Sequence, residues 1–327
     1  MRSPFTGGNA TLRHEVSELA YRKETFKYVH LYYECDETKE RFTTTELDEV
    51  NIGQIYNQYR AKYGIPFLDE IASLRKQYGL PAIKMSRILG FGDNQFRLYE
   101  NGDMPSEANG KILMGIKNPL VLKTFLINSK NQFSEDEYHK MLRKVDAIPT
   151  EKDDSERKQY LFHGIRRDIT NGFAPQSISK LENVILFFIN RFDGVFYTMM
   201  NKLLFYADFY SYKTRGIGLT GLSYVAIQRG PVPVRWDRIY SFFDDIRPEI
   251  VHFGNGVEGT KLKADVDFNK ALFSEEESGI LEKVYERFSE VNASQISETS
   301  HDEEAWQQFV GKKEPVDYSM AFSLKAM

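Results

Sequence analysis

Polar and apolar positions follow two different patterns in the first part of the chain. Residues 14–34 alternate polar and aromatic side chains, as in "YRKETFKYVHLYYE", which predicts two short strands of a hairpin. The segment "TTTELDEVN" comes next and predicts a helix start, with Thr44 or Thr45 as N-cap and acidic residues in the first turn. A small β element is therefore expected to precede a helical region.

The helical pattern runs from Pro66 to Phe125 and predicts short helices. Three of them lie in "PFLDEIASLRKQYG", "PAIKMSRILGFG" and "DNQFRLYENG", and each is expected to end at a glycine. Asp93 is the expected N-cap of the third. Two more helices are predicted in "PSEANGKILMGI" and "NPLVLKTFLINS".

The second half of the chain begins with a charged stretch and ends in an apolar block. Residues 131–172 contain one amphipathic helix, "SEDEYHKMLRKV", and a predicted linker, "PTEKDDSERKQ". From near Gln176, two strongly apolar helices are predicted around "LENVILFFINRF" and "VFYTMMNKLLFYADFYSYK". The strand-like "LSYVAIQRGPVP" follows them.

Composition indicates a soluble cytoplasmic protein. Of the 327 residues, 41% are hydrophobic, enough for two or three domain cores. The single cysteine, Cys35, excludes an intramolecular disulfide and is typical of a reducing compartment. The most apolar window, "VILFFI", is too short to span a bilayer, and the N-terminus lacks the apolar run of a signal peptide. No membrane partner is expected.

The net charge of −4 hides an uneven distribution. Residues 59–130 carry 11 basic and 6 acidic side chains, a net charge of +5. Residues 1–58 carry −3, and the remainder of the chain carries −6. A basic middle segment between acidic ends is typical of a nucleic-acid-binding module.

Two of the short helices match the pattern of a helix-turn-helix DNA reader. Gly90 and Gly92 lie in the turn, and Phe96 and Tyr99 are expected on the buried face of the second helix. The outward polar side chains are predicted to reach base edges, and nearby basic residues to contact phosphates. The predicted DNA-binding residues are Lys84, Arg87, Asn94, Gln95, Arg97 and Lys111. The alternative is a short helical hairpin with a solvated charged face.

The stretch "LPAIKMSRILGFGDNQFRLYENGDMPS" also resembles the MqsA-type (YgiT-type) antitoxins. Proteins of this type join an N-terminal zinc ribbon, built from two Cys-x-x-Cys knuckles, to a helix-turn-helix. Here the first knuckle reads Ser3-Pro4-Phe5-Thr6 and the second reads Cys35-Asp36-Glu37-Thr38. Three of the four ligand positions therefore hold a hydroxyl side chain. The resemblance also implies dimerisation through the helix-turn-helix region, which makes the chain a candidate homodimer.

These departures predict a ribbon without metal. Neutral hydroxyls are poor zinc ligands, so Cys35 alone cannot hold a structural zinc ion. His14 and His30 do not occupy knuckle positions, and we expect the hairpin to be stabilised by its aromatic face.

The predicted DNA-binding helix also differs from the pattern of the MqsA-type antitoxins. The resemblance places an Asn and, four residues later, an Arg on the recognition helix; Asn94 matches, but Leu98 stands at the Arg position.

The C-terminal block resembles the Panacea domain, also called SocA-like, from about residue 178 to the end. The resemblance rests on a set of landmarks that occur in the expected order, here called the landmark residues. They are Lys202, Tyr206, Asp208, Gly221, Tyr224, Gly230, Pro231, Pro233, His301, Trp306, Asp317 and Tyr318. The resemblance implies an antitoxin module that binds and neutralises a co-encoded toxin.

The landmark residues also have a purely structural interpretation. Tyr206 and its neighbours are expected in a helix core. Asp208 and His301 suggest acid–base catalysis, but a mid-helix Asp beside aromatic residues commonly anchors a tyrosine hydroxyl or a backbone amide. The Ser-His pair at 300–301 is expected as a helix-start cap. The sequence contains no nucleophile elbow, phosphate-binding glycine loop or metal-ligand cluster, so we expect neither an enzyme nor a cofactor.

Together these patterns predict a mainly α protein with small β elements. The expected parts are a metal-free ribbon hairpin (1–58), an XRE-like helix-turn-helix bundle (59–130), a charged helix and linker (131–172), and an α-rich Panacea-like domain with a short β hairpin (173–327). The predicted function is a type II antitoxin that neutralises a cognate toxin encoded nearby and binds its own operator DNA. The alternative is a transcriptional regulator whose C-terminal domain senses a ligand or protein without a toxin partner.

Overall fold

The computed structural model describes residues 1–149, 154–254 and 256–327. About half of the chain is helical and its sheets are small and antiparallel, which confirms the prediction of a mainly α protein with small β elements. The chain divides into two compact units: residues 1–55 with 154–327, and residues 56–153. Within the described residues, no helix combines the length and apolar character needed to cross a membrane.

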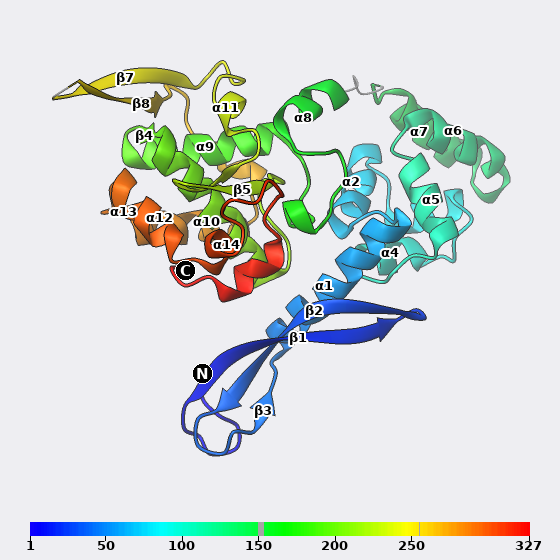
Figure 1. Cartoon of the computed structure of the whole chain (residues 1–327). Coiled ribbons are helices and arrows are strands. Elements are labelled where there is room, and N and C mark those ends of the chain that lie inside the picture. Colours follow the sequence, from blue (N-terminus) through cyan, green and yellow to red (C-terminus); the bar gives the residue numbers. More distant parts are fainter. Residues whose placement is uncertain (150–153, 255) are drawn as a thin grey trace. The chain divides into compact units, whose positions relative to one another are not determined.

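The N-terminal hairpin is longer than predicted. Strands β1 (Ala10–Tyr21) and β2 (Glu24–Cys35) each have 12 residues and pair in continuous antiparallel register, and the short β3 (Arg41–Phe42) joins the other edge of β2 (Figure 1). The two strands meet at Arg22 and Lys23, which both have positive φ. A two-residue turn of this kind matches the strand twist, but it usually contains Asn or Gly. The sequence therefore lacked the signal that marks the turn.

Helix α1 (Thr45–Tyr63) begins where it was predicted, because the Thr44 hydroxyl accepts a hydrogen bond from the Leu47 N–H at 3.3 Å. Two amide side chains of α1 bind the edge of β2. Asn51 bonds both backbone groups of Leu31, and Gln54 bonds both backbone groups of Val29, at 2.8–3.0 Å. These four bonds satisfy edge groups that would otherwise lack a partner strand.

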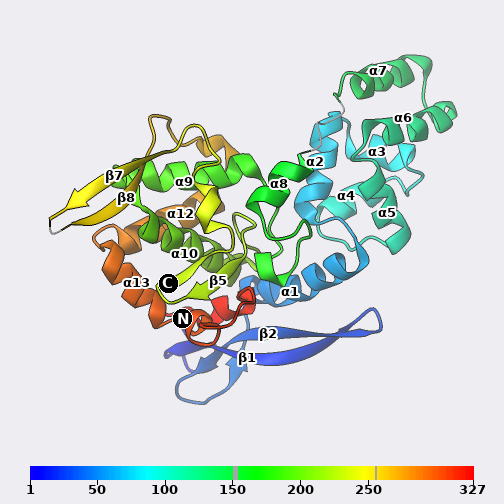
Figure 2. The ribbon, with the colours of Figure 1, turned by 45° about the horizontal axis from the view of Figure 1, so that its top comes forward.

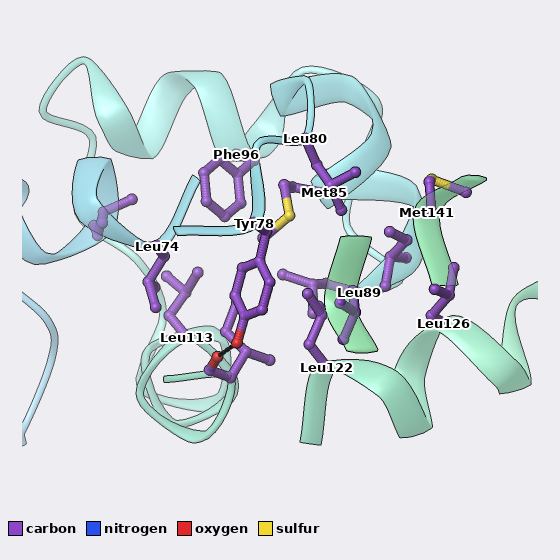
Figure 3. Close-up of a cluster of buried hydrophobic side chains, with 14 of the residues drawn as sticks. Leu74, Tyr78, Leu80, Met85, Leu89, Phe96, Leu113, Leu122, Leu126 and Met141 are labelled. Carbon is purple, nitrogen blue, oxygen red and sulfur yellow. Dashed lines mark hydrogen bonds between the residues drawn. The ribbon is translucent and has the colours of Figure 1, made fainter. Parts of the chain in front are cut away.

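The unit of residues 56–153 is a bundle of short helices. They are α2 (Leu68–Tyr78), α3 (Ala82–Ile88), α4 (Gln95–Glu100), α5 (Glu107–Gly115), α6 (Pro119–Asn128), the 3-10 turn η1 (Lys130–Gln132) and α7 (Glu135–Asp146). Figure 3 shows their shared core, in which Tyr78 donates a hydrogen bond to the Ile116 carbonyl; burial raises the pKa of Tyr78 to about 12. The predicted charged helix is α7, and its residues Tyr138, Met141 and Val145 belong to this core.

The remaining elements build the C-terminal part of the other unit. The helices are α8 (Ser155–Leu161), α9 (Ile178–Phe192), α10 (Tyr197–Arg215), α11 (Trp236–Ile239), α12 (Glu275–Phe288), α13 (Ala293–His301) and α14 (Glu304–Gln307). The strands are β4 (Val195–Phe196), β5 (Tyr224–Ile227), β6 (Gly230–Pro233), β7 (Arg247–Phe253) and β8 (Val257–Lys263). Three 3-10 segments are η2 (Ile169–Asn171), η3 (Lys270–Leu272) and η4 (Tyr318–Ser323).

Helix α10 is the centre of this part, because α9, α12 and α13 all pack against it (Figure 2). Strands β5 and β6 form the short hairpin that was predicted. A second sheet, of order β4-β8-β7, was not predicted. Residues 150–153 of the predicted linker lie outside the described residues, while its later part forms α8.

Candidate functional site

The predicted DNA reader consists of α3, α4 and the turn between them. Phe96 and Tyr99 are buried in the bundle core as expected, and the Ser86 hydroxyl of α3 accepts a hydrogen bond from the Phe96 N–H at 3.0 Å. Asn94 and Arg97 are exposed and Gln95 is half-buried. Leu98, at the position where the resemblance expects Arg, is 42% exposed. The outward face of α4 therefore presents polar groups beside one apolar side chain.

Two of the predicted phosphate-binding cations already have partners in the chain. Arg87 pairs with Asp93 at 3.1 Å, which raises the pKa of Arg87 and lowers that of Asp93. The expectation that Asp93 caps α4 is wrong, because the N-cap position of this helix is Asn94. The Asp93 carboxylate pairs with Arg87 instead. Lys84 pairs with Glu137 of α7 at 2.5 Å, whereas Lys111 is exposed on α5. Phosphate contacts from Arg87 and Lys84 would compete with these ion pairs.

The two knuckle segments adopt the same backbone geometry. In the first, Ser3 N–H donates to Gly8 O at 2.8 Å, and Gly7 N–H donates to Ser3 O at 2.9 Å. In the second, Cys35 N–H donates to Glu40 O and Lys39 N–H donates to Cys35 O, both at 2.9 Å. The fifth residue of each turn, Gly7 or Lys39, has positive φ. The two turns therefore share one hydrogen-bond pattern although their sequences differ.

The four side chains at the knuckle positions meet around the buried sulfur of Cys35. The thiol lies 3.7 Å from the Thr6 hydroxyl, and hydrogen bonds from Ser3, from the backbone and side chain of Thr38, and from Thr6 lower its pKa to about 6. A thiolate among hydroxyl donors is a stable arrangement. In the part of the chain that the structure describes, no group of three or more His, Cys, Asp or Glu residues could hold a metal ion.

Asp208 organises the core of the C-terminal part. Its carboxylate is fully buried and accepts hydrogen bonds from Leu219 N–H and Thr220 N–H at 2.7 Å, from the Tyr224 hydroxyl at 2.7 Å, and from the Thr220 hydroxyl. Burial raises the pKa of Asp208, while these hydrogen bonds act in the opposite direction. Asp208 thus anchors a tyrosine hydroxyl and backbone amides, as its structural interpretation predicted.

Glu303 has a similar role but was not predicted. It is 1% exposed and accepts hydrogen bonds from the Tyr206 hydroxyl at 3.3 Å and from the backbone N–H groups of Lys325 and Ala326 at 2.7 and 3.0 Å. The carboxylate therefore ties α10 to the end of the chain. Its only sequence signal was its position two residues after His301.

The other landmark residues hold the loops together. The Tyr318 hydroxyl donates to Leu222 O at 2.7 Å, and Trp306 Nε1 donates to Ile227 O at 2.7 Å. Asp317 caps η4 by accepting from Ser319 N–H at 2.7 Å. Burial raises the pKa of Tyr224 and Tyr318 well above the usual range, so both hydroxyls remain donors.

His301 stacks on Trp306, with ring centroids 4.2 Å apart, and among the described residues it is not a hydrogen-bond partner of Asp208. Ser300 and His301 lie at the end of α13, which corrects the expectation of a helix-start cap. Ser300 donates its hydroxyl hydrogen to Ser297 O at 2.7 Å. His301 therefore packs on Trp306, and Ser300 lies beside Gly230 of β6.

Two landmark glycines occupy positions that exclude a side chain. Gly221 has φ of +80° and Gly230 has φ of +99°. A Cβ on Gly230 would lie 2.7 Å from Lys202 Cε and would also collide with the Ser300 hydroxyl. Pro231 and Pro233 are buried in β6. Lys202 and Ser300, which are far apart in the sequence, thus both lie beside Gly230 at the start of β6.

A scan against protein-family models matches residues 200–307 to the antitoxin SocA-like, Panacea domain. Residues 200–307 are therefore similar to this domain, and the C-terminal part of the chain that contains them is called the Panacea domain below. The match includes the landmark residues from Lys202 to Trp306, and it supports an antitoxin role in general. Searches of curated proteins and of solved structures found no match.

Proposed function

We propose that the protein is the antitoxin of a type II toxin–antitoxin system and neutralises a cognate toxin encoded nearby. The observation that carries this proposal is the match of residues 200–307 to the antitoxin SocA-like, Panacea domain. Neutralisation by a bound domain is stoichiometric, so affinity and slow dissociation determine its effect.

The landmark residues of the Panacea domain serve this function indirectly. Tyr206, Asp208, Tyr224 and Tyr318 are each fully buried, so a rigid partner would not contact them directly. We infer that they maintain the domain and that toxin contacts come mainly from exposed side chains around them. We also infer that the protein is not an enzyme, because the donors around Asp208 come from the chain itself and leave no reactive oxygen open.

We further propose that α3 and α4 bind operator DNA. The exposed polar side chains of Asn94, Arg97 and Lys111 and the net charge of +5 over residues 59–130 support this proposal. The same observations also favour the second candidate function, a transcriptional regulator without a toxin partner. The two candidates differ in whether the Panacea domain binds a toxin.

Co-expression with the product of the adjacent gene tests the antitoxin proposal. We expect the full-length chain to restore growth and to co-purify with the toxin. The variant Asp208→Ala should lose both effects, since it removes the hydrogen-bond anchor of the domain core, whereas the matched surface variant Asp237→Ala should retain both. A harmless and unbound neighbour, together with a gel shift on promoter DNA, would favour the regulator.

A further inference from the structure

Among the described residues of the Panacea domain, three ionic side chains are buried, and one of them has no partner. Asp208 and Glu303 each accept several hydrogen bonds from the chain. Lys202 is equally buried, at 1% exposure, yet it has no ion pair or hydrogen bond among the described residues. A buried ammonium without a counter-ion costs folding free energy, and a hydrophobic residue of similar volume would avoid that cost.

The position of Lys202 is defined by Gly230. Its Nζ would lie 3.1 Å from a Cβ at position 230, so the ammonium lies directly beside the Gly230 backbone at the start of β6. Burial, and to a lesser extent the nearby charge of Arg229, lower the pKa of Lys202 to about 8. At neutral pH the group therefore remains mostly protonated in spite of its burial.

Two further nitrogen-bearing side chains flank the same hairpin. Arg229 is exposed in the β5–β6 turn and directly precedes Gly230. Trp306 donates a hydrogen bond from Nε1 to Ile227 O of β5 and stacks on the ring of His301, whose Nε2 atom is buried without a hydrogen-bond partner among the described residues. The end of the β5–β6 hairpin therefore combines the exposed cation of Arg229, the buried and unpaired cation of Lys202, and the His301 Nε2 atom, which makes no hydrogen bond among the described residues.

We propose that Lys202, Arg229 and His301 form a carboxylate-binding site, and that an acidic side chain of the toxin occupies it. The choice of a toxin carboxylate rests on the proposed antitoxin function. A partner that approaches the exposed turn meets Arg229 first and Lys202 behind it. The partner's charge then supplies the counter-ion that the free domain lacks, so the folding cost of the buried ammonium is recovered as binding free energy.

This arrangement predicts that stability and affinity change in opposite directions. In the full-length protein, Lys202→Met keeps the volume of the side chain and removes its charge. We expect a higher melting temperature for the free protein and toxin binding weakened by about 30-fold or more. A purely structural role would instead lower the melting temperature without a specific loss of affinity. The matched control Lys312→Met, at an exposed lysine of the same part, should change neither quantity.

The exposed arginine provides a variant whose folding is not at risk. We expect Arg229→Gln to weaken toxin binding several-fold, mainly through slower association, and the difference should shrink at high salt. Unchanged toxin affinity in both Lys202→Met and Arg229→Gln would overturn the proposal.

A probe without toxin separates failure of the site from failure of the antitoxin proposal. Sodium acetate, compared with sodium chloride at equal ionic strength, should raise the melting temperature of the free wild-type protein more than that of Lys202→Met. If the toxin does not bind but acetate has this effect, the carboxylate site stands and the assigned occupant is wrong. Equal acetate effects in wild type and Lys202→Met would remove the site itself.

Discussion

The knuckle region and the Panacea domain both gather polar side chains, but they do so through different kinds of contact. The knuckles are shaped by backbone hydrogen bonds that span only four or five residues, such as those from Gly7 to Ser3 and from Ser3 to Gly8. The Panacea domain depends on side-chain bonds between distant segments, including Tyr206 to Glu303, 97 residues apart. The knuckle turns can therefore keep their backbone geometry when their side chains are substituted. The Panacea domain depends on the side chains that form these long-range hydrogen bonds.

The geometry of the two knuckle turns does not require a metal ion. Each turn satisfies its own backbone groups, and the three hydroxyls at positions 3, 6 and 38 stabilise the Cys35 thiolate instead of sharing a cation with it. In the Panacea domain, loss of Asp208 would leave donors from three residues unsatisfied in a closed core. The following predictions test this contrast.

Restoring the thiolates should create a zinc site. We expect the triple variant Ser3→Cys, Thr6→Cys, Thr38→Cys to bind about one zinc ion per chain, because the four side chains already converge. Structural zinc sites are worth about 10 kcal/mol or more in apparent binding free energy. Elemental analysis and the spectrum of the cobalt-substituted protein measure the effect. The double variant Ser3→Cys, Thr6→Cys, which retains Thr38, should bind zinc far more weakly. If the triple variant also binds no zinc, the four side chains do not converge as the structure indicates.

Removing the buried carboxylate should destabilise the Panacea domain strongly. We expect Asp208→Ala to lower the free energy of unfolding by about 4 kcal/mol, since it leaves buried amide and hydroxyl donors without an acceptor. Urea unfolding measures the loss. The exposed Asp237→Ala should change it by less than about 0.5 kcal/mol. Equal effects of the two variants would show that the hydrogen bonds to Asp208 do not hold this core together.

Changes on the outward face of α4 should weaken DNA binding without affecting the fold. We expect Asn94→Ala and Arg97→Ala each to reduce operator affinity by roughly 1–3 kcal/mol. Fluorescence anisotropy on promoter DNA measures the effect, with Arg143→Ala on α7 as the exposed control. Unchanged affinity in both variants would remove α4 from the recognition role.

The last prediction concerns the charge on Cys35. Its pKa is lowered from the usual 9.0 to about 6, so the unfolded chain binds more protons than the folded chain between these values. The stabilising contribution of the thiolate is complete above about pH 9 and is lost as the pH falls through about 6. The difference in unfolding free energy between wild type and Cys35→Ser should therefore grow from pH 6 to pH 9. A pH-independent difference would mean that folding does not lower the pKa of the Cys35 thiol.

Local patterns predicted the features that depend on neighbouring residues. The three-residue spacing of Phe96 and Tyr99 identified the buried face of α4, and Thr44 marked the start of α1. The apolar surroundings of Asp208 predicted an anchoring role for it. The long β1–β2 pairing was only partly predicted, because Arg22 and Lys23 give no turn signal. The sheet that contains β7 and β8 was missed because its strands are exposed and lack a clear apolar alternation.

The order of residues alone determined where α1 starts, which side chains of α4 face inward and which segment carries the landmark residues, because these properties depend on short-range periodicity and capping. Only the tertiary structure decided which charges find partners. Glu303 reaches Tyr206 and the C-terminal backbone, Arg87 is paired with Asp93, and Lys202 remains unpaired beside Gly230. The electrostatic environment of a side chain depends on segments that only folding brings within a few ångströms.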